Sequence, residues 1–186
     1  LSLQSKLVLS ITLTLLVFGW IYIFLSEYDN PATLGNMNFF EKLIASFFQS
    51  VTFRTAGYTT INQGNLTYAA KFLGIIFMLI GGSSGSTAGG IKTVTIGAVL
   101  AAVISVIKGR DSVCVFKKSI SFNTVQKALT VIIMMIGFLI VLSIALSFTE
   151  KNIDCEYEFI DLFFEASSAL GTVGLTTGIT PYLSIL

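Results

Sequence analysis

The apolar positions of this chain fall in long runs that no charged residue interrupts. Leu7–Leu25 contains 19 residues without a charge, and Ala128–Thr149 contains 22. At about 1.5 Å of rise per residue, either run forms a helix long enough to cross about 30 Å of hydrocarbon. The pattern therefore predicts two helices that cross a membrane.

A third apolar run, Phe72–Ile107, is too long for one crossing. A straight helix over these residues would measure about 54 Å. Lys92 is its only charge, and the ten residues 81–90 in its middle are five glycines, three serines, one threonine and one alanine. Interior glycine disfavours a helix by about 1 kcal/mol relative to alanine. We therefore expect the helix to bend or break at residues 81–90.

The composition agrees with a membrane protein. Hydrophobic residues make up 54% of the chain and charged residues only 11%, against about 25% charged in soluble domains. This argues against a water-soluble domain, a disordered chain, a disulfide scaffold and a basic nucleic-acid binder. Histidine is absent, which removes the commonest metal ligand and general base. The fold class predicted is an all-α integral membrane protein.

The charges between the runs predict how the chain is oriented. Residues 108–127 hold five basic side chains and one acid, so the positive-inside rule places this loop in the cytoplasm. Residues 26–39 and 150–157 then lie outside, where Glu27, Asp29 and the acids between 150 and 161 either solvate the loops or form a vestibule that concentrates cations. Cys114 and Cys155 fall on opposite sides and cannot form a disulfide.

Two shorter pieces, Phe40–Thr52 and Glu158–Ser168, are too short to span and form a repeat. Each follows an outward crossing and ends in a turn rich in glycine and threonine. Residues 41–60 laid over 158–177, an offset of 117, give seven identities in 20 positions. The chain thus repeats a crossing helix, a half-helix that re-enters the membrane, and a Thr-x-Gly-x-Thr segment.

Such a unit suits a cation path. Irregular backbone is tolerated at membrane depth only where it is buried or lines a water-filled cavity. A half-helix entering from outside points its partly negative C-terminal end at the membrane centre. Backbone carbonyl oxygens after it can replace the water shell of a dehydrated ion. Glycine at positions 57 and 174 permits the backbone conformations required.

These motifs resemble the Trk/Ktr/HKT potassium transporter superfamily, most closely its bacterial KtrB/TrkH pore-forming subunits. The resemblance implies a selectivity filter and an intramembrane gating loop, with potassium as the transported ion and no covalent cofactor or enzyme activity. The filter, which binds the cation, would comprise Thr55, Ala56, Gly57, Tyr58, Thr172, Val173, Gly174 and Leu175. The gating loop would comprise Gly81, Gly82, Ser83, Ser84, Gly85, Ser86, Thr87, Ala88, Gly89, Gly90 and Lys92.

The resemblance also implies an organisation into repeats. That family has four helix–pore-loop–helix repeats, and this chain would hold about 1.7 of them: residues 1–107 as the third, the loop 108–127, and 128–186 as most of the fourth. The expected parts are outer helices 7–25 and 128–149, pore helices 40–52 and 158–168, filters 55–59 and 172–176, and a broken inner helix 66–107. Phe53 stands where proline is expected.

The resemblance implies partners and a location as well. The subunit would lie in the plasma membrane, the inner membrane of bacteria with two, as a multi-pass protein among lipids. It would form a homodimer on a cytoplasmic nucleotide-binding ring, without nucleic acid. In that family, serine at a filter glycine tends to admit sodium.

Several features have a simpler interpretation. The repeated threonines and glycines could be ordinary turn formers, and Gly81 and Gly85 have the GxxxG spacing of packed helices. Arg54 could cap the last carbonyls of its pore helix as filter support, and Lys92 could reach the cytoplasmic interface. The alternative function is a structural membrane subunit that packs through small residues and transports nothing. Residues 85–93 miss the phosphate-loop pattern because Ile91 separates glycine from lysine.

Overall fold

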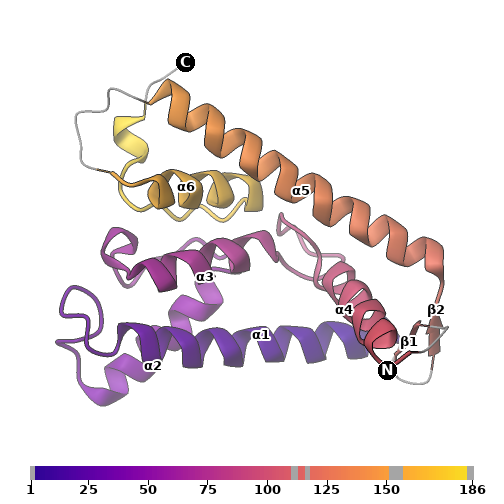
Figure 1. Cartoon of the computed structure of the whole chain (residues 1–186). Helices are drawn as coiled ribbons and strands as arrows, with labels where there is room; N and C mark the ends of the chain where they lie inside the picture. The colour runs from indigo at the N-terminus through magenta and orange to yellow at the C-terminus, as the bar shows by residue number, and fades with distance from the viewer. Residues whose placement is uncertain (1–2, 110–112, 116–117, 151–156, 184–186) are drawn as a thin grey trace.

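A computed structural model describes residues 3–109, 113–115, 118–150 and 157–183. The described chain is mostly helical (Figure 1). Its α-helices are α1 (Leu3–Glu27), α2 (Phe39–Thr52), α3 (Tyr68–Leu79), α4 (Thr93–Ile107), α5 (Phe122–Thr149) and α6 (Phe159–Gly171). Short 3-10 turns, η1 (Gln63–Asn65) and η2 (Thr180–Tyr182), and two strands, β1 (Val113–Val115) and β2 (Lys118–Ile120), complete the described elements.

The two long helices, α1 and α5, are long and apolar enough to cross a membrane. Only 17% and 11% of the residues in their most apolar stretches are buried, so they are not core helices of a soluble protein. Both extend beyond the predicted runs 7–25 and 128–149. In α5 the added residues start at the N-cap Ser121, whose side chain accepts a hydrogen bond from the Thr124 amide. Polar turns thus prolong the helix past its apolar run.

The third apolar run is broken where the glycines predict. Helix α3 ends at Leu79 and α4 begins at Thr93, with a loop between them that reaches toward α5 and α6 (Figure 1). Thr67 caps the start of α3 by accepting a hydrogen bond from the Ala70 amide. Two short helices therefore replace the single 54 Å helix that the run would otherwise form.

The short helices α2 and α6 begin with matching carboxylate caps. The Asn38 amide donates to Glu41 at 2.9 Å, and the Glu158 amide donates to Asp161 at 3.2 Å. Helix α2 packs on α1, whereas α6 lies between α3 and α5 (Figure 1). Helix α6 ends at Gly171, three residues beyond the predicted boundary.

The segment predicted to be the cytoplasmic loop, residues 108–127, holds secondary structure of its own. Strands β1 and β2 pair antiparallel there, with Val113 opposite Ile120, and α5 already begins at Phe122. β-Branched residues at the pairing positions favour this short hairpin. Cys155 lies outside the described residues, and so does the expectation that it cannot pair with Cys114.

The buried core sits where α3, α6 and the end of α2 meet. Phe53 and Phe164 are both fully buried, with ring centroids 6.3 Å apart in an edge-to-face arrangement. A side chain at Gly74 would collide with the Phe53 ring, so glycine lets α3 approach it. Phe53, found where proline was expected, therefore fills the core beneath the end of α2.

Candidate functional site

The two Thr-x-Gly-x-Thr segments, residues 55–59 and 172–176, have the same unusual backbone. Thr55 and Thr172 are the two described residues other than glycine with positive φ, at 66° and 53°. Gly57 and Gly174, two residues further along, have φ of 77° and 88°. All four angles match at the offset of 117 residues. Left-handed conformation at threonine costs about 1–2 kcal/mol, and Thr172 adopts it as the C-cap of α6.

The two segments touch each other. A Cβ added to Gly57 would overlap the carbonyl oxygen of Val173 and come within 3.9 Å of the Gly174 Cα. Gly174 itself has open space where a Cβ would stand. The fold thus brings together segments that are more than a hundred residues apart in the sequence.

The side chains of the predicted filter residues differ in exposure. Val173 and Leu175 are buried, Tyr58 is 73% exposed, and Ala56 and Thr172 are also exposed. The Thr52 hydroxyl donates to the Tyr58 carbonyl at 2.5 Å, and the Val173 amide donates to the Ser168 carbonyl at 2.9 Å. Each segment is thereby fastened to the end of the helix before it.

The glycine-rich loop, residues 81–90, folds back on itself. The Ile91 amide donates to the Leu79 carbonyl at 2.7 Å, and the Ser86 hydroxyl donates to the Ser83 carbonyl at 2.9 Å. A Cβ on Gly81 would overlap the Gly89 carbonyl. The interpretation of Gly81 and Gly85 as a helix-packing pair is wrong, because this stretch is not helical and nothing lies within 4 Å of a Cβ built on Gly85.

The loop forms one hydrogen bond with the second segment and one with Arg54, the residue before the first segment. The Gly89 amide donates to the Thr172 hydroxyl at 3.0 Å. The Arg54 guanidinium donates to the Gly81 carbonyl at 3.4 Å, while its buried Nε has no partner among the described residues. The expectation that the Arg54 side chain caps the last carbonyls of α2 is wrong for the described contacts. Arg54 reaches past the helix end to the loop.

Lys92 also belongs to this loop. Its ammonium donates to the carbonyl of Ala88 and, at 3.4 Å, to that of Ser86. A lysine held by two carbonyls four and six residues earlier does not extend to an interface. The structure therefore favours loop contacts over the alternative in which Lys92 reaches the cytoplasmic side.

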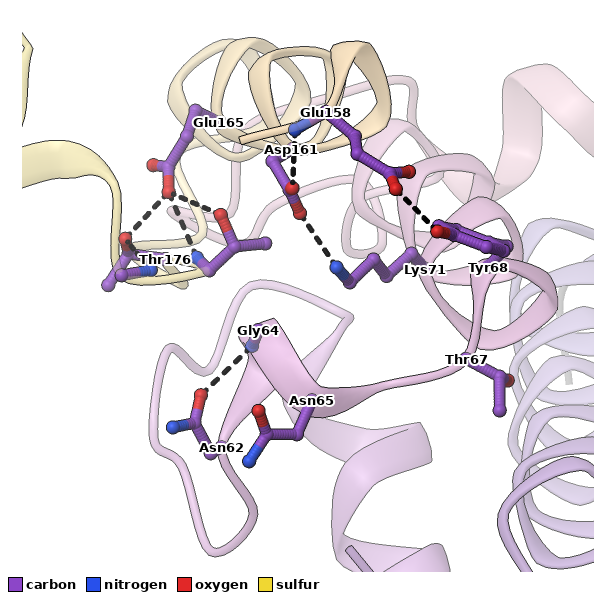
Figure 2. A network of polar contacts seen from close by, with 12 residues as sticks. Asn62, Gly64, Asn65, Thr67, Tyr68, Lys71, Glu158, Asp161, Glu165 and Thr176 are labelled. Atoms are coloured by element: carbon purple, nitrogen blue, oxygen red, sulfur yellow. Dashed lines mark hydrogen bonds and ion pairs between the residues drawn. The ribbon is translucent and has the colours of Figure 1, made fainter. Parts of the chain in front are cut away.

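A buried ion pair joins α3 to α6. Lys71 Nζ lies 2.7 Å from Asp161 Oδ1, with the two side chains 7% and 12% exposed (Figure 2). Beside it, the Tyr68 hydroxyl donates to Glu158 at 2.5 Å. These four residues line a cavity of about 510 Å³ together with Gly64, Leu66, Thr67 and Tyr157.

Glu165, in the middle of α6, holds the chain that follows Gly174. Its Oε1 accepts hydrogen bonds from the Thr176 hydroxyl at 2.6 Å and the Thr177 amide at 2.9 Å (Figure 2). The Thr177 hydroxyl donates to the same oxygen at 3.3 Å, and the Thr180 hydroxyl donates to Oε2 at 3.0 Å.

Some acidic residues have structural roles that the sequence left open. Glu27 is fully buried and accepts hydrogen bonds from Asn30, Thr33 and Thr67, which join the end of α1 to the start of α3. It therefore neither solvates a loop nor lines a vestibule.

Sequence reasoning did not single out Lys71 or Glu165. Lys71 is the lone charge of the apolar helix α3, and Glu165 is one of two acids in the otherwise uncharged α6, so a charge among apolar residues is the signal that marks both.

Within the described ranges, no group of three or more His, Cys, Asp or Glu side chains could hold a metal ion. The polar atoms close to the paired segments belong to backbone groups, threonines, Arg54 and Glu165, whose carboxylate accepts a hydrogen bond from Thr176. This chemistry suits weak, reversible coordination of a cation by oxygen atoms.

Comparison with known proteins gives one consistent result. The family model of the TrkH cation transport proteins matches residues 1–185. The chain is 40% identical over 184 residues to Ktr system potassium uptake protein B of Bacillus subtilis, covering 98% of this chain and 40% of that protein. It is 40% identical over 188 residues to potassium/sodium uptake protein NtpJ of Enterococcus hirae, covering 100% of this chain and 41% of that protein. To Ktr system potassium uptake protein B of Vibrio alginolyticus it is 35% identical over 184 residues, covering 99% of this chain and 39% of that protein. The chain thus spans about two fifths of the length of these relatives.

Proposed function

The chain belongs to the TrkH family of cation transport proteins, and on that premise we propose that it forms part of a potassium-conducting pore in the plasma membrane. Its relatives are named as potassium or potassium/sodium uptake proteins, not as enzymes. We choose potassium as the principal ion because both Thr-x-Gly-x-Thr segments carry glycine at their centre. The activity would be that of the whole protein, with no covalent cofactor.

The observation that carries this proposal is the matched backbone of the two segments. Positive φ at Thr55 and Gly57, repeated at Thr172 and Gly174, gives each segment a conformation that an ordinary strand does not have. The segments lie against one another. In the proposal their backbone carbonyls replace part of the water shell of potassium, together with equivalent segments elsewhere in the protein. The filter residues remain Thr55–Tyr58 and Thr172–Leu175.

The proposed arrangement in the membrane follows from charge and helix length. Helices α1 and α5 both cross outward from the cytoplasmic side, the side on which the positive-inside rule places the basic segment 108–127. Helices α2 and α6 re-enter from outside, as pore helices, and direct their partly negative ends to the membrane centre. In this arrangement α1 to α4 form one repeat, residues 1–107, and α5 and α6 with the following segment belong to another, residues 128–186.

The glycine-rich loop is the proposed gate. It is held to Thr172 and Arg54, so it lies next to both filter segments. Opening requires these two hydrogen bonds to break. Five glycines and four small hydroxyl side chains in ten residues leave a backbone that can move without rearranging a packed core.

The proposed partners come from the resemblance to the KtrB/TrkH subunits and from the relatives' names. Two of the relatives are named as parts of a Ktr system, which supports association with further components. We propose a homodimer of pore subunits, surrounded by lipid, on a cytoplasmic ring that binds nucleotides. Nucleic acid has no part in this proposal.

Uptake by the full-length parent protein tests the proposed function. In cells without their own potassium uptake, the parent should restore growth at low potassium and accumulate a potassium tracer. A parent that inserts in the membrane but gives no uptake, with its soluble partner co-expressed, would support the structural membrane subunit instead.

A further inference from the structure

One acidic side chain contacts the chain next to the proposed filter more extensively than any other described carboxylate. Glu165 accepts from three hydroxyl groups and one amide, all between Thr176 and Thr180. Both of its oxygens are engaged. Hydrogen bonds to an ionised acceptor are roughly twice as strong as those between neutral groups.

The bonded turn begins two residues after Gly174. The Gly178 amide donates to the Thr176 hydroxyl at 2.9 Å, and the Thr176 and Thr180 hydroxyls are 2.7 Å apart. The turn is therefore closed within itself, and Glu165 ties it as a unit to α6. Since α6 also leads into Thr172, Glu165 fixes the second filter segment at the end opposite its helix.

The same turn contacts the part of the chain that follows the first segment. A Cβ on Gly64 would stand 2.5 Å from the Thr177 carbonyl oxygen. Gly64 follows Gln63, which is buried and exchanges hydrogen bonds with Gln49 of α2. A chain of contacts thus runs from Glu165 through Thr177 and residues 63–64 to α2, the helix that precedes the first segment.

The first segment is held by different chemistry. At the offset of 117 residues, the position that corresponds to Glu165 is Phe48. The neutral Gln49–Gln63 pair and the Thr52 hydroxyl fasten the chain around residues 58–63. A charged anchor is thus found behind only one of the two described segments.

We propose that Glu165 is a positioning residue that sets the geometry, and hence the ion discrimination, of the second filter segment. This inference rests on the proposed function. The carboxylate acts through the turn 176–180 and not by binding the ion, because its oxygens are occupied by donors of the protein. Removing its acceptors leaves the Thr177 amide without its partner and frees the turn.

Two Glu165 variants of the full-length protein and one matched control test this. Glu165→Leu removes all acceptors, whereas Glu165→Gln keeps one carbonyl oxygen. Glu158→Gln removes the same charge from the N-cap of the same helix, keeps an acceptor for Tyr68 and does not touch residues 172–180. The measurement is the ratio of potassium to sodium uptake in cells lacking their own uptake systems, with membrane insertion checked for each variant.

We expect Glu165→Leu to lower the ratio about tenfold, which is what one lost charge-assisted hydrogen bond produces if it is expressed wholly in discrimination. Glu165→Gln should fall between Leu and the wild type, and Glu158→Gln should keep the wild-type ratio. An unchanged ratio in an inserted Glu165→Leu variant would overturn the proposal. So would an equal loss in Glu158→Gln, because charge alone would then explain the effect.

If Glu165→Leu fails to insert, the double variant Thr177→Val and Thr180→Val removes two of the donors and keeps the carboxylate. It should also lower the ratio, and an unchanged ratio would overturn the proposal. A wild-type protein that takes up no potassium contradicts the proposed function itself, whereas selective uptake by both the wild type and the Glu165 variants contradicts only the role of Glu165.

Discussion

The amide of Gly89 donates a 3.0 Å hydrogen bond to the hydroxyl of Thr172. These residues are 83 positions apart, one in the glycine-rich loop and one at the start of the second Thr-x-Gly-x-Thr segment. A Cβ on Gly89 would overlap the Thr172 hydroxyl and stand 2.7 Å from the Gly171 carbonyl. The proposed gate therefore lies in direct contact with the proposed filter.

Replacing Thr172 by valine should raise potassium flux. Valine keeps the β-branched shape but has no acceptor for the Gly89 amide, so the closed loop loses a bond of about 0.5–1.5 kcal/mol. Thr172→Ser keeps the hydroxyl and is the matched control. Initial uptake rates in the full-length protein should increase severalfold for valine only. Equal rates in the valine and serine variants would mean that the bond does not hold the loop closed.

Deleting Ser83–Ala88 should raise flux further while leaving the preference for potassium largely intact. The deletion removes most of the obstruction but none of the residues in the two Thr-x-Gly-x-Thr segments. Tracer uptake of potassium and sodium gives both quantities in one assay. A properly inserted deletion variant with unchanged or lower potassium flux would remove the gate from the account.

Much of this arrangement could be predicted from the sequence, for a physical reason. An uncharged run of 19 or 22 residues and a cluster of glycines each determine whether their own stretch of chain is helical. The two long apolar helices and the break between Leu79 and Thr93 therefore follow directly from the residues. The identities at the offset of 117 likewise marked the four positions with matched positive φ.

The partners of polar side chains could not be predicted in the same way. The charge pattern predicts that Glu27 either solvates a loop or forms part of a vestibule, but Glu27 is buried against Thr67, 40 residues away. The position of Arg54 after the pore helix predicts a cap on that helix, but its side chain contacts Gly81. Hydropathy reports how costly it is to bury a polar group, whereas the packing of α3 against α6 and α1 decides which partner that group meets. Glu165 was missed for the same reason.

Replacing only one residue of the buried Lys71–Asp161 pair should destabilise the protein strongly, whereas replacing both should cost little stability. Lys71→Met leaves an uncompensated carboxylate and should destabilise the protein by about 3–5 kcal/mol, whereas Lys71→Met with Asp161→Leu should recover most of that loss. The measurement is the thermal unfolding of the detergent-solubilised parent.

Lys71→Arg keeps the charge pair and serves as the control, with stability near that of the wild type. If Lys71→Met alone unfolds at the wild-type temperature, the ion pair does not hold α3 to α6.

The central claim is that residues 55–59 and 172–176 form part of a potassium filter, and Gly174→Ser tests it most directly. A serine Cβ at this position meets nothing within 4 Å, so packing is preserved and the change acts on the backbone at φ 88° and on the oxygens around the ion. Gly57→Ser is less suitable, because its Cβ would also overlap the Val173 carbonyl.

The measurement is the ratio of potassium to sodium uptake by the full-length Gly174→Ser variant beside the wild type. Left-handed strain of about 1–2 kcal/mol corresponds to about a tenfold change. The account therefore predicts a ratio lower by about tenfold, with potassium uptake still measurable. A Gly174→Ser variant that inserts normally and keeps the wild-type ratio would contradict it.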